Sequence, residues 1–194
     1  MLLPGLGNSD RSMFVMKRYL RALGYHVEGW GLGRNFGIRT VGQDAKKLID
    51  RIEKMAEEAG EPISLIGVSL GGMLARLVAQ RLPGKIREVI TIASPYAGDP
   101  RATNVWRLYQ WLSGESLASD EARNRLAELS APLKVPATAI WSPSDGLVNG
   151  FICHSRTEPG LETIKIPGSH MGVQLRPTVM RAVADVLARK QNGG

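Results

Sequence analysis

Short apolar segments alternate with longer amphipathic segments along most of this chain. Four of the apolar segments have the length of β-strands: Ile63–Val68, Ile86–Ala93, Ala137–Trp141 and Leu161–Ile166. Largely apolar strands that alternate with helices are typical of a parallel sheet covered on both faces. We therefore predict an α/β fold, with a mostly parallel sheet of about six strands and helices on both faces.

Two more strands complete the predicted sheet, Met1–Leu3 and Tyr25–Trp30. Helices are expected over four amphipathic segments, which are Phe14–Leu23, Thr40–Ala59, Leu70–Leu82 and Pro177–Arg189. In parallel sheets ligands bind beyond the carboxyl ends of the strands. Candidate functional residues should therefore come directly after each strand.

Length and composition fit one globular domain over residues 1–194, because a domain has roughly 150 residues and 43% of this chain is hydrophobic. There is no apolar run of about 18 residues, so no transmembrane helix is expected. The first residues lack the pattern of a signal peptide. Cys153 is the only cysteine, which excludes an internal disulfide and a thiolate zinc cluster. We expect a cytoplasmic protein.

The net charge of +7 comes from 25 basic and 18 acidic residues. The basic residues are spread along the chain, and no nucleic-acid recognition motif accompanies them. We interpret them as solvated helix faces and expect no nucleic-acid partner. Peripheral contact with a lipid or other anionic surface stays open, and the sequence does not predict an oligomeric state.

A Gly-rich turn carries a serine at Gly67-Val68-Ser69-Leu70-Gly71. The motif follows an apolar strand and opens a helix, the context in which G-x-S-x-G is a nucleophile elbow. A sharp turn crowds the residues two before and two after the serine unless they lack side chains. We predict that Ser69 is a nucleophile. The alternative is that this Gly-rich turn serves only the packing of the strand against the helix.

A serine nucleophile needs a base and a group that orients the base. His170 comes directly after the last predicted strand, and Asp145 follows the strand before it. Asp145 could instead be a turn residue that bonds its own backbone, and Asp99 is the other carboxylate considered. His26 lies within a predicted strand and His154 in a segment without clear pattern, so both are weaker candidates for the base.

Negative charge that develops during acyl transfer needs backbone N–H donors. Leu70 follows the nucleophile and supplies one donor, and we assign the second to Leu6 in the Gly-rich loop Pro4–Gly7. The alternative for that loop is a tight turn without function. It lacks the lysine and hydroxyl of a phosphate-binding loop. No metal-ligand spacing occurs in the sequence, so we expect no metal and no cofactor.

Taken together, the segments PGLGNS, GVSLGG, SPSDGLV and GSHMGV resemble the α/β-hydrolase superfamily, and most of all its compact bacterial lipases and esterases. The resemblance covers nearly the whole chain and implies a minimal α/β-hydrolase fold. It also implies a catalytic triad of Ser69, Asp145 and His170, with an oxyanion hole formed by Leu6 and Leu70. Pro4 departs from the pattern, because many relatives have histidine there.

About forty residues without a predicted strand separate Ala93 from Pro136, too many for a simple connection. We predict a helical cap or lid inserted at 96–132. Its aromatic residues could line a substrate pocket or could be ordinary core, and they include Trp106, Tyr109 and Trp111. Asn35 and Phe36, in the loop Gly31–Gly37, are candidates for the pocket rim; the alternative is a mobile loop.

The expected function is hydrolysis of carboxylic esters, by an esterase or lipase that acts on small-molecule acyl esters. Two alternatives stay open at this point. The same triad serves an acyltransferase or thioesterase, and a hydrolase scaffold can also be a non-catalytic binding module. The sequence does not determine the acyl chain or the alcohol group.

Overall fold

The computed structural model describes residues 1–97, 124, 127–148, 150–155 and 157–191. Within these residues the chain forms a five-stranded, entirely parallel sheet in the order β1-β2-β3-β4-β5. The strands are β1 (Leu2–Leu3), β2 (Ile63–Val68), β3 (Ile86–Ile92), β4 (Ala137–Trp141) and β5 (Leu161–Lys165). The predicted α/β class is confirmed, and β2 and β4 have the predicted bounds.

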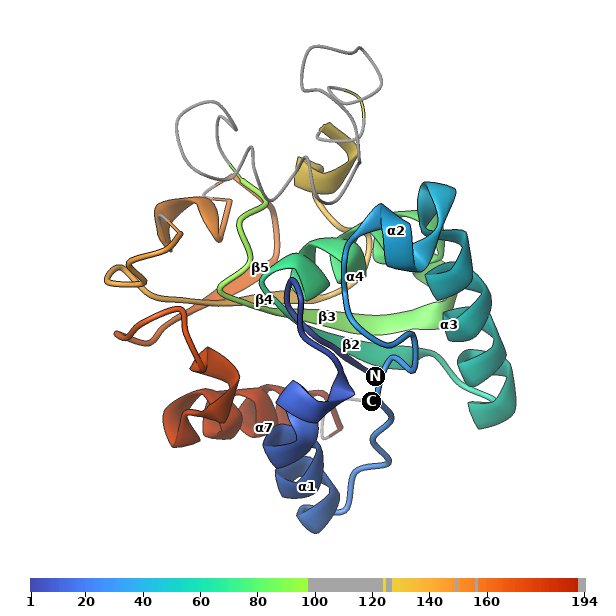
Figure 1. The fold of residues 1–194 in the computed structure, drawn as a ribbon, viewed down its shortest axis with the longest axis horizontal. Helices are drawn as coiled ribbons and strands as arrows, with labels where there is room; N and C mark the ends of the chain where they lie inside the picture. The colour runs from blue at the N-terminus through green and yellow to red at the C-terminus, as the bar shows by residue number, and fades with distance from the viewer. Residues whose placement is uncertain (98–123, 125–126, 149, 156, 192–194) are drawn as a thin grey trace.

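Helices cover both faces of the sheet (Figure 1). On one face lie α1 (Phe14–Ala22) and α7 (Pro177–Gln191), and on the other lie α3 (Lys46–Ala59) and α4 (Leu70–Arg81). The shorter helical segments are α2 (Ile38–Val41) and the 3-10 turns η1 (Asp10–Met13), η2 (Gln43–Ala45), η3 (Pro83–Lys85), η5 (Gly150–Ile152) and η6 (Val173–Leu175).

The strands feed two hydrophobic cores, one on each side of the sheet. Because successive side chains of a strand point to opposite faces, adjacent residues join different cores. Leu2, Ile66 and Ile90 pack with residues of α1 and α7. Their neighbours along the strands, which are Leu3, Leu65 and Val89, pack with residues of α3 and α4.

The strand predicted over Tyr25–Trp30 is wrong. The segment makes one isolated parallel bridge, between Gly29 and Leu2, so the described sheet has five strands rather than about six. At the carboxyl end of this segment, the two side-chain oxygens of Asp10 accept the N–H groups of Trp30 and Gly31 at 3.0 and 3.1 Å. These backbone donors satisfy a carboxylate instead of extending a strand ladder.

The helix predicted over Thr40–Ala59 is interrupted. Gly42, Asp44 and Ala45 have φ values of 79°, 54° and 58°, which no α-helix contains, and α3 begins only at Lys46. Apolar residues keep a helical spacing across the break, so hydrophobic periodicity did not reveal it. The other predicted helices are present within a few residues of their expected bounds.

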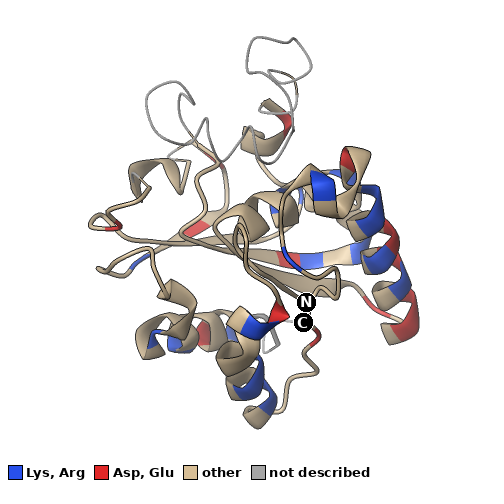
Figure 2. Ribbon diagram, in the orientation of Figure 1, with Lys and Arg blue, Asp and Glu red and all other residues tan. Residues whose placement is uncertain are grey.

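Charged side chains lie on helices at both faces of the sheet (Figure 2). Lys and Arg are visible on α1, α3 and α7, and acidic residues are interleaved with them along α3. The interpretation of these residues as solvated faces stays a prediction. None of the helices built from described residues is long and apolar enough to cross a membrane.

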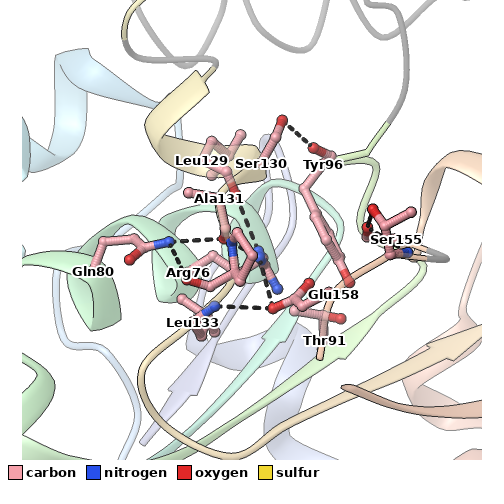
Figure 3. A network of polar contacts seen from close by, with 12 residues as sticks. Arg76, Gln80, Thr91, Tyr96, Leu129, Ser130, Ala131, Leu133, Ser155 and Glu158 are labelled. Carbon is pink, nitrogen blue, oxygen red and sulfur yellow. Dashed lines mark hydrogen bonds and ion pairs between the residues drawn. The ribbon is translucent and has the colours of Figure 1, made fainter. Parts of the chain in front are cut away.

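Most of the predicted insertion at 96–132 lies outside the described residues, so its status as a cap, and the single-domain organisation, stay predictions. Its two ends are described, and Tyr96 and Leu129 are buried there. Arg76 of α4 holds both ends (Figure 3): its guanidinium stacks on the Tyr96 ring at 3.8 Å and donates to Leu129 O at 3.1 Å and Ala131 O at 2.8 Å.

The same guanidinium forms a buried ion pair with Glu158, at 3.1 Å. Both side chains are almost fully buried, with exposed fractions of 1% and 2%. Oε1 of Glu158 also accepts the Leu133 N–H at 3.1 Å (Figure 3). One cation therefore joins α4, both ends of the 96–132 segment and the chain just before β5.

Replacing Arg76 with alanine is expected to lower the free energy of unfolding by about 3–5 kcal/mol, because it leaves the Glu158 carboxylate buried without its cation. Urea unfolding followed by circular dichroism measures the change. Arg181→Ala is the matched control, because that arginine is 81% exposed in its i,i+4 pair with Asp185. It should cost no more than about 0.5 kcal/mol. Equal losses in the two variants would contradict the assigned role of Arg76.

Candidate active site

The turn between β2 and α4 holds Ser69 in a backbone conformation that is rare for a residue with a side chain. Its φ is 52° and its ψ is −119°. Glycine is required on both sides: a Cβ at Gly67 would collide with the backbone of Gly71 and Gly72, and a Cβ at Gly71 with the carbonyls of Leu3 and Pro4. Strain of this kind concentrates at functional sites, and the turn has the features of a nucleophile elbow.

His170 and Asp145 form a hydrogen-bonded chain with Ser69. Nε2 of His170 lies 3.2 Å from Ser69 Oγ, and Nδ1 lies 2.9 Å from Asp145 Oδ2. A carboxylate can only accept hydrogen bonds, so the proton of the neutral ring belongs on Nδ1. Nε2 is then free to accept the Ser69 hydroxyl proton. The structure thus brings together the three side chains singled out in the sequence.

Asp145 is buried and held at several points. Its Oδ1 accepts the N–H groups of Leu147 and Val148 at 3.2 and 2.8 Å, which leaves Oδ2 for the imidazole. The backbone N–H of His170 also donates to the Asp145 carbonyl at 2.9 Å. Asp145 is therefore a turn residue that bonds its own backbone through Oδ1, and it also bonds His170 through Oδ2.

Ser142 was missed in the sequence, although it also follows a strand directly. Its hydroxyl donates to Gly168 O at 2.7 Å and accepts the Gly168 N–H at 2.8 Å. It thereby ties the loop that carries Asp145 to the loop that carries His170. The sequence feature that could have identified Ser142 is its position, because it is a polar residue directly after the strand β4.

Cys153 lies buried near Asp145. Burial and the negative charge of Asp145 raise the pKa of its thiol. The thiolate is the nucleophilic form of cysteine, so this environment disfavours Cys153 as a nucleophile.

The loop Pro4–Gly7 approaches the serine closely. A Cβ built on Gly5 would lie 3.5 Å from Ser69 Cβ. Leu70 is the first residue of α4, where backbone N–H groups have no partner within the helix. Among the described residues, the turn, loop and cap hydrogen bonds of the backbone include none from the N–H of Leu6 or Leu70. Both predicted donors therefore belong to segments that adjoin Ser69.

Asn35 requires a correction. It was expected at the rim of a substrate pocket, but its side chain is completely buried, with an exposed fraction of 0%. Its amide donates to Pro4 O at 2.7 Å and accepts the Gly37 N–H at 3.1 Å. Asn35 therefore contacts the loop of Leu6 rather than open space. Phe36, the next residue, is partly exposed, and its contact with substrate stays a prediction.

The competing candidates lie elsewhere or outside the described residues. His26 lines a hollow with Ile63 and Arg87, at the amino ends of β2 and β3 and thus at the opposite end of the sheet from Ser69. His154 stacks on the Trp141 ring, with 4.4 Å between the ring centroids. The structure does not describe Asp99 or the predicted pocket residues Trp106, Tyr109 and Trp111.

These features define the protein as an α/β-hydrolase. They are the parallel sheet, the strained serine at the end of β2, and the aspartate and histidine later in the chain. Residues 2–145 match the model of the family described as serine aminopeptidase, S33. The match spans most of the chain, and the chain belongs to this family. No curated protein matches the chain significantly.

Solved structures share the fold at low sequence identity. The monoacylglycerol lipase of Paleococcus ferrophilus is 16% identical, with a TM-score of 0.68 over 97% of this chain and 93% of that one. A thioesterase domain from the curacin biosynthetic pathway is 15% identical, with a TM-score of 0.64 over 97% and 89%. BpoC of Mycobacterium tuberculosis, described as a putative non-heme bromoperoxidase, is 16% identical, with a TM-score of 0.67 over 97% of this chain and 91% of that one. At these identities the likeness establishes the fold.

Proposed function

We propose that this protein hydrolyses carboxylic esters through an acyl-enzyme formed on Ser69. The observation that carries the proposal is the hydrogen-bonded chain from Ser69 Oγ through His170 to Asp145. A serine hydroxyl is a weak nucleophile by itself, and a neutral imidazole within hydrogen-bond distance can remove its proton as the oxygen attacks.

In the first half of the proposed reaction, Ser69 Oγ attacks the ester carbonyl carbon and its proton passes to His170 Nε2. The carbonyl oxygen becomes an oxyanion, which the N–H groups of Leu6 and Leu70 stabilise. Asp145 accepts the Nδ1–H of His170 and stabilises the imidazolium. The bond from carbon to the alcohol oxygen then breaks, the alcohol takes the proton from Nε2, and the acyl group stays on Ser69.

Water completes the cycle by the same steps. His170 Nε2 removes a proton from water as the water oxygen attacks the acyl carbon, and the same two N–H groups receive the second oxyanion. Collapse releases the acid, and Ser69 Oγ recovers the proton from His170. If an alcohol or amine replaces water, the enzyme is an acyltransferase. If the substrate is a thioester, it is a thioesterase.

We expect the ester to carry an apolar acyl group, because two large apolar side chains on the loops of Asp145 and His170 are exposed. Leu147 and Met171 follow Asp145 and His170 closely in the chain, and both are strongly exposed, at 57% and 79%. Because both residues lie on the loops that carry Asp145 and His170, we propose that they contribute apolar surface to the substrate site. The lipase and thioesterase among the structural neighbours are consistent with this chemistry.

A fluorophosphonate probe tests the proposal, because it reacts with an activated serine. Labelling should occur on Ser69, located by peptide mass spectrometry. The second arm measures hydrolysis of p-nitrophenyl esters from acetate to palmitate, beside the p-nitroanilide of the best acyl group and its thioester. Esters turned over fastest would support the proposal; preference for the anilide or the thioester would replace it with a peptidase or thioesterase. Absence of labelling and turnover would favour the non-catalytic module.

A further inference from the structure

The loop Pro4–Asn8 forms a tight turn beside Ser69. The N–H of Asn8 donates to Gly5 O at 3.1 Å, and Gly7 has a φ of 70°, as the third residue of a type II turn requires. Leu6 is the second residue of this turn. Its N–H belongs to the peptide unit that joins Gly5 to Leu6, so the direction of that donor depends on how firmly this peptide and its neighbours are held.

Asn35 makes four hydrogen bonds, three of them to this loop. Its backbone N–H donates to Asn8 O at 2.8 Å, and its carbonyl accepts the Gly7 N–H at 2.7 Å. Its side-chain amide donates to Pro4 O at 2.7 Å, while Oδ1 accepts the Gly37 N–H at 3.1 Å. The side chain is completely buried, so water does not compete for these groups.

These bonds hold the peptide units on both sides of the Leu6 donor. The contact with Pro4 O orients the peptide between Pro4 and Gly5, and the contact with Gly7 N–H orients the peptide between Leu6 and Gly7. The peptide between Gly5 and Leu6 lies between these two. Its carbonyl oxygen, Gly5 O, accepts the Asn8 N–H, and its N–H, which is the Leu6 donor, points in the opposite direction to that carbonyl. Pro4 has no N–H of its own, so its carbonyl is the one backbone polar group through which this residue can be anchored.

We propose that Asn35 is a positioning residue for the oxyanion hole: its side chain orients the loop so that the Leu6 N–H faces the oxygen that becomes charged. The inference rests on the proposed function. Preorganised donors stabilise a transition state more than a ground state. Loss of the Asn35 amide should therefore lower kcat and weaken binding of a transition-state analogue by a similar factor, with little change in KM.

Two variants test the role. Asn35→Leu removes the amide with little change in volume, and Asn35→Ala removes it without overpacking; both retain the two backbone bonds. With p-nitrophenyl butyrate, kcat should fall by about 10–100-fold, which is less than the roughly 10²–10³-fold effect of removing an oxyanion donor, because the Leu6 N–H is misoriented rather than lost. The inhibition constant of phenylboronic acid, which forms a tetrahedral adduct on the serine, should rise by a similar factor. KM should stay within about threefold.

Thr40→Val is the matched control. The Thr40 hydroxyl donates to Arg34 O at 2.7 Å and accepts the Phe36 N–H at 3.0 Å, so these two hydrogen bonds brace the neighbours of Asn35 and do not involve the Pro4–Asn8 loop. Its removal should lower Tm while kcat and boronate affinity stay within about twofold of the wild type. Similar kinetic losses in Thr40→Val would overturn the specific role of Asn35.

The outcomes separate the two proposals. If Ser69→Ala abolishes turnover and boronate binding while folded Asn35 variants keep both, the positioning role is wrong and the proposed function stands. If Ser69→Ala leaves both unchanged, the proposed function is wrong and the positioning role falls with it. Should neither Asn35 variant fold, NMR of the wild type decides: boronate should shift the resonances of the Leu6 N–H and the Asn35 side-chain amide, and an unmoved Asn35 amide overturns the proposal.

Discussion

Replacing Ser69 with alanine is expected to lower kcat for ester hydrolysis by about 10⁴–10⁶-fold, the size of effect that loss of a triad nucleophile has elsewhere. The substitution removes one oxygen atom, so the fold should persist. Turnover of the best p-nitrophenyl ester, measured on protein whose circular dichroism matches the wild type, tests the expectation.

Ser64→Ala is the matched control for this variant. Ser64 lies on the same strand, β2, and its hydroxyl donates to Glu88 at 2.9 Å, at the amino end of the sheet. Its loss should cost stability of about 1 kcal/mol and leave kcat within about twofold. A Ser69→Ala enzyme that keeps more than a tenth of the wild-type activity would show that the nucleophile is another residue.

Asp145→Asn is expected to lower the rate by about 10⁴-fold, because an amide favours the wrong imidazole tautomer. The surroundings predict how the new side chain is oriented. The N–H groups of Leu147 and Val148 both donate to Oδ1, so they hold the asparagine oxygen there. The NH₂ group then faces His170 Nδ1, which must become an acceptor. The proton moves to Nε2, where it prevents removal of the Ser69 proton.

Steady-state kinetics of Asp145→Asn beside Asp99→Asn measures this effect. Asp185→Asn, on an exposed helix face, controls for loss of a negative charge and should leave the rate unchanged. A larger loss in Asp99→Asn than in Asp145→Asn would assign the acid to the chain after β3. Equal and small losses in both would contradict a triad that uses either carboxylate.

Local patterns were sufficient for the parts of this protein that are built from contiguous residues. The strands Ile63–Val68 and Ala137–Trp141 are marked by apolar runs between turn residues, and both are confirmed to the residue. The elbow around Ser69 is likewise local, because the glycines two positions before and after it prevent a collision within one turn. Serine, aspartate and histidine each follow a parallel strand, which predicted that they would gather at one sheet edge, and their hydrogen-bond distances agree.

The tertiary structure decided the features that depend on side chains reaching across the chain. Asp10 accepts the N–H groups of Trp30 and Gly31, at the end of a segment with strand-like composition that forms only a single bridge. Asn35 turns into the interior to bind the Pro4 carbonyl, 31 positions earlier in the chain. Hydrophobic periodicity reports which residues are buried, but a hydrogen bond between distant residues leaves no periodic trace. Such contacts exist only once the two segments have been brought together, because each is too weak by itself to order the chain between them.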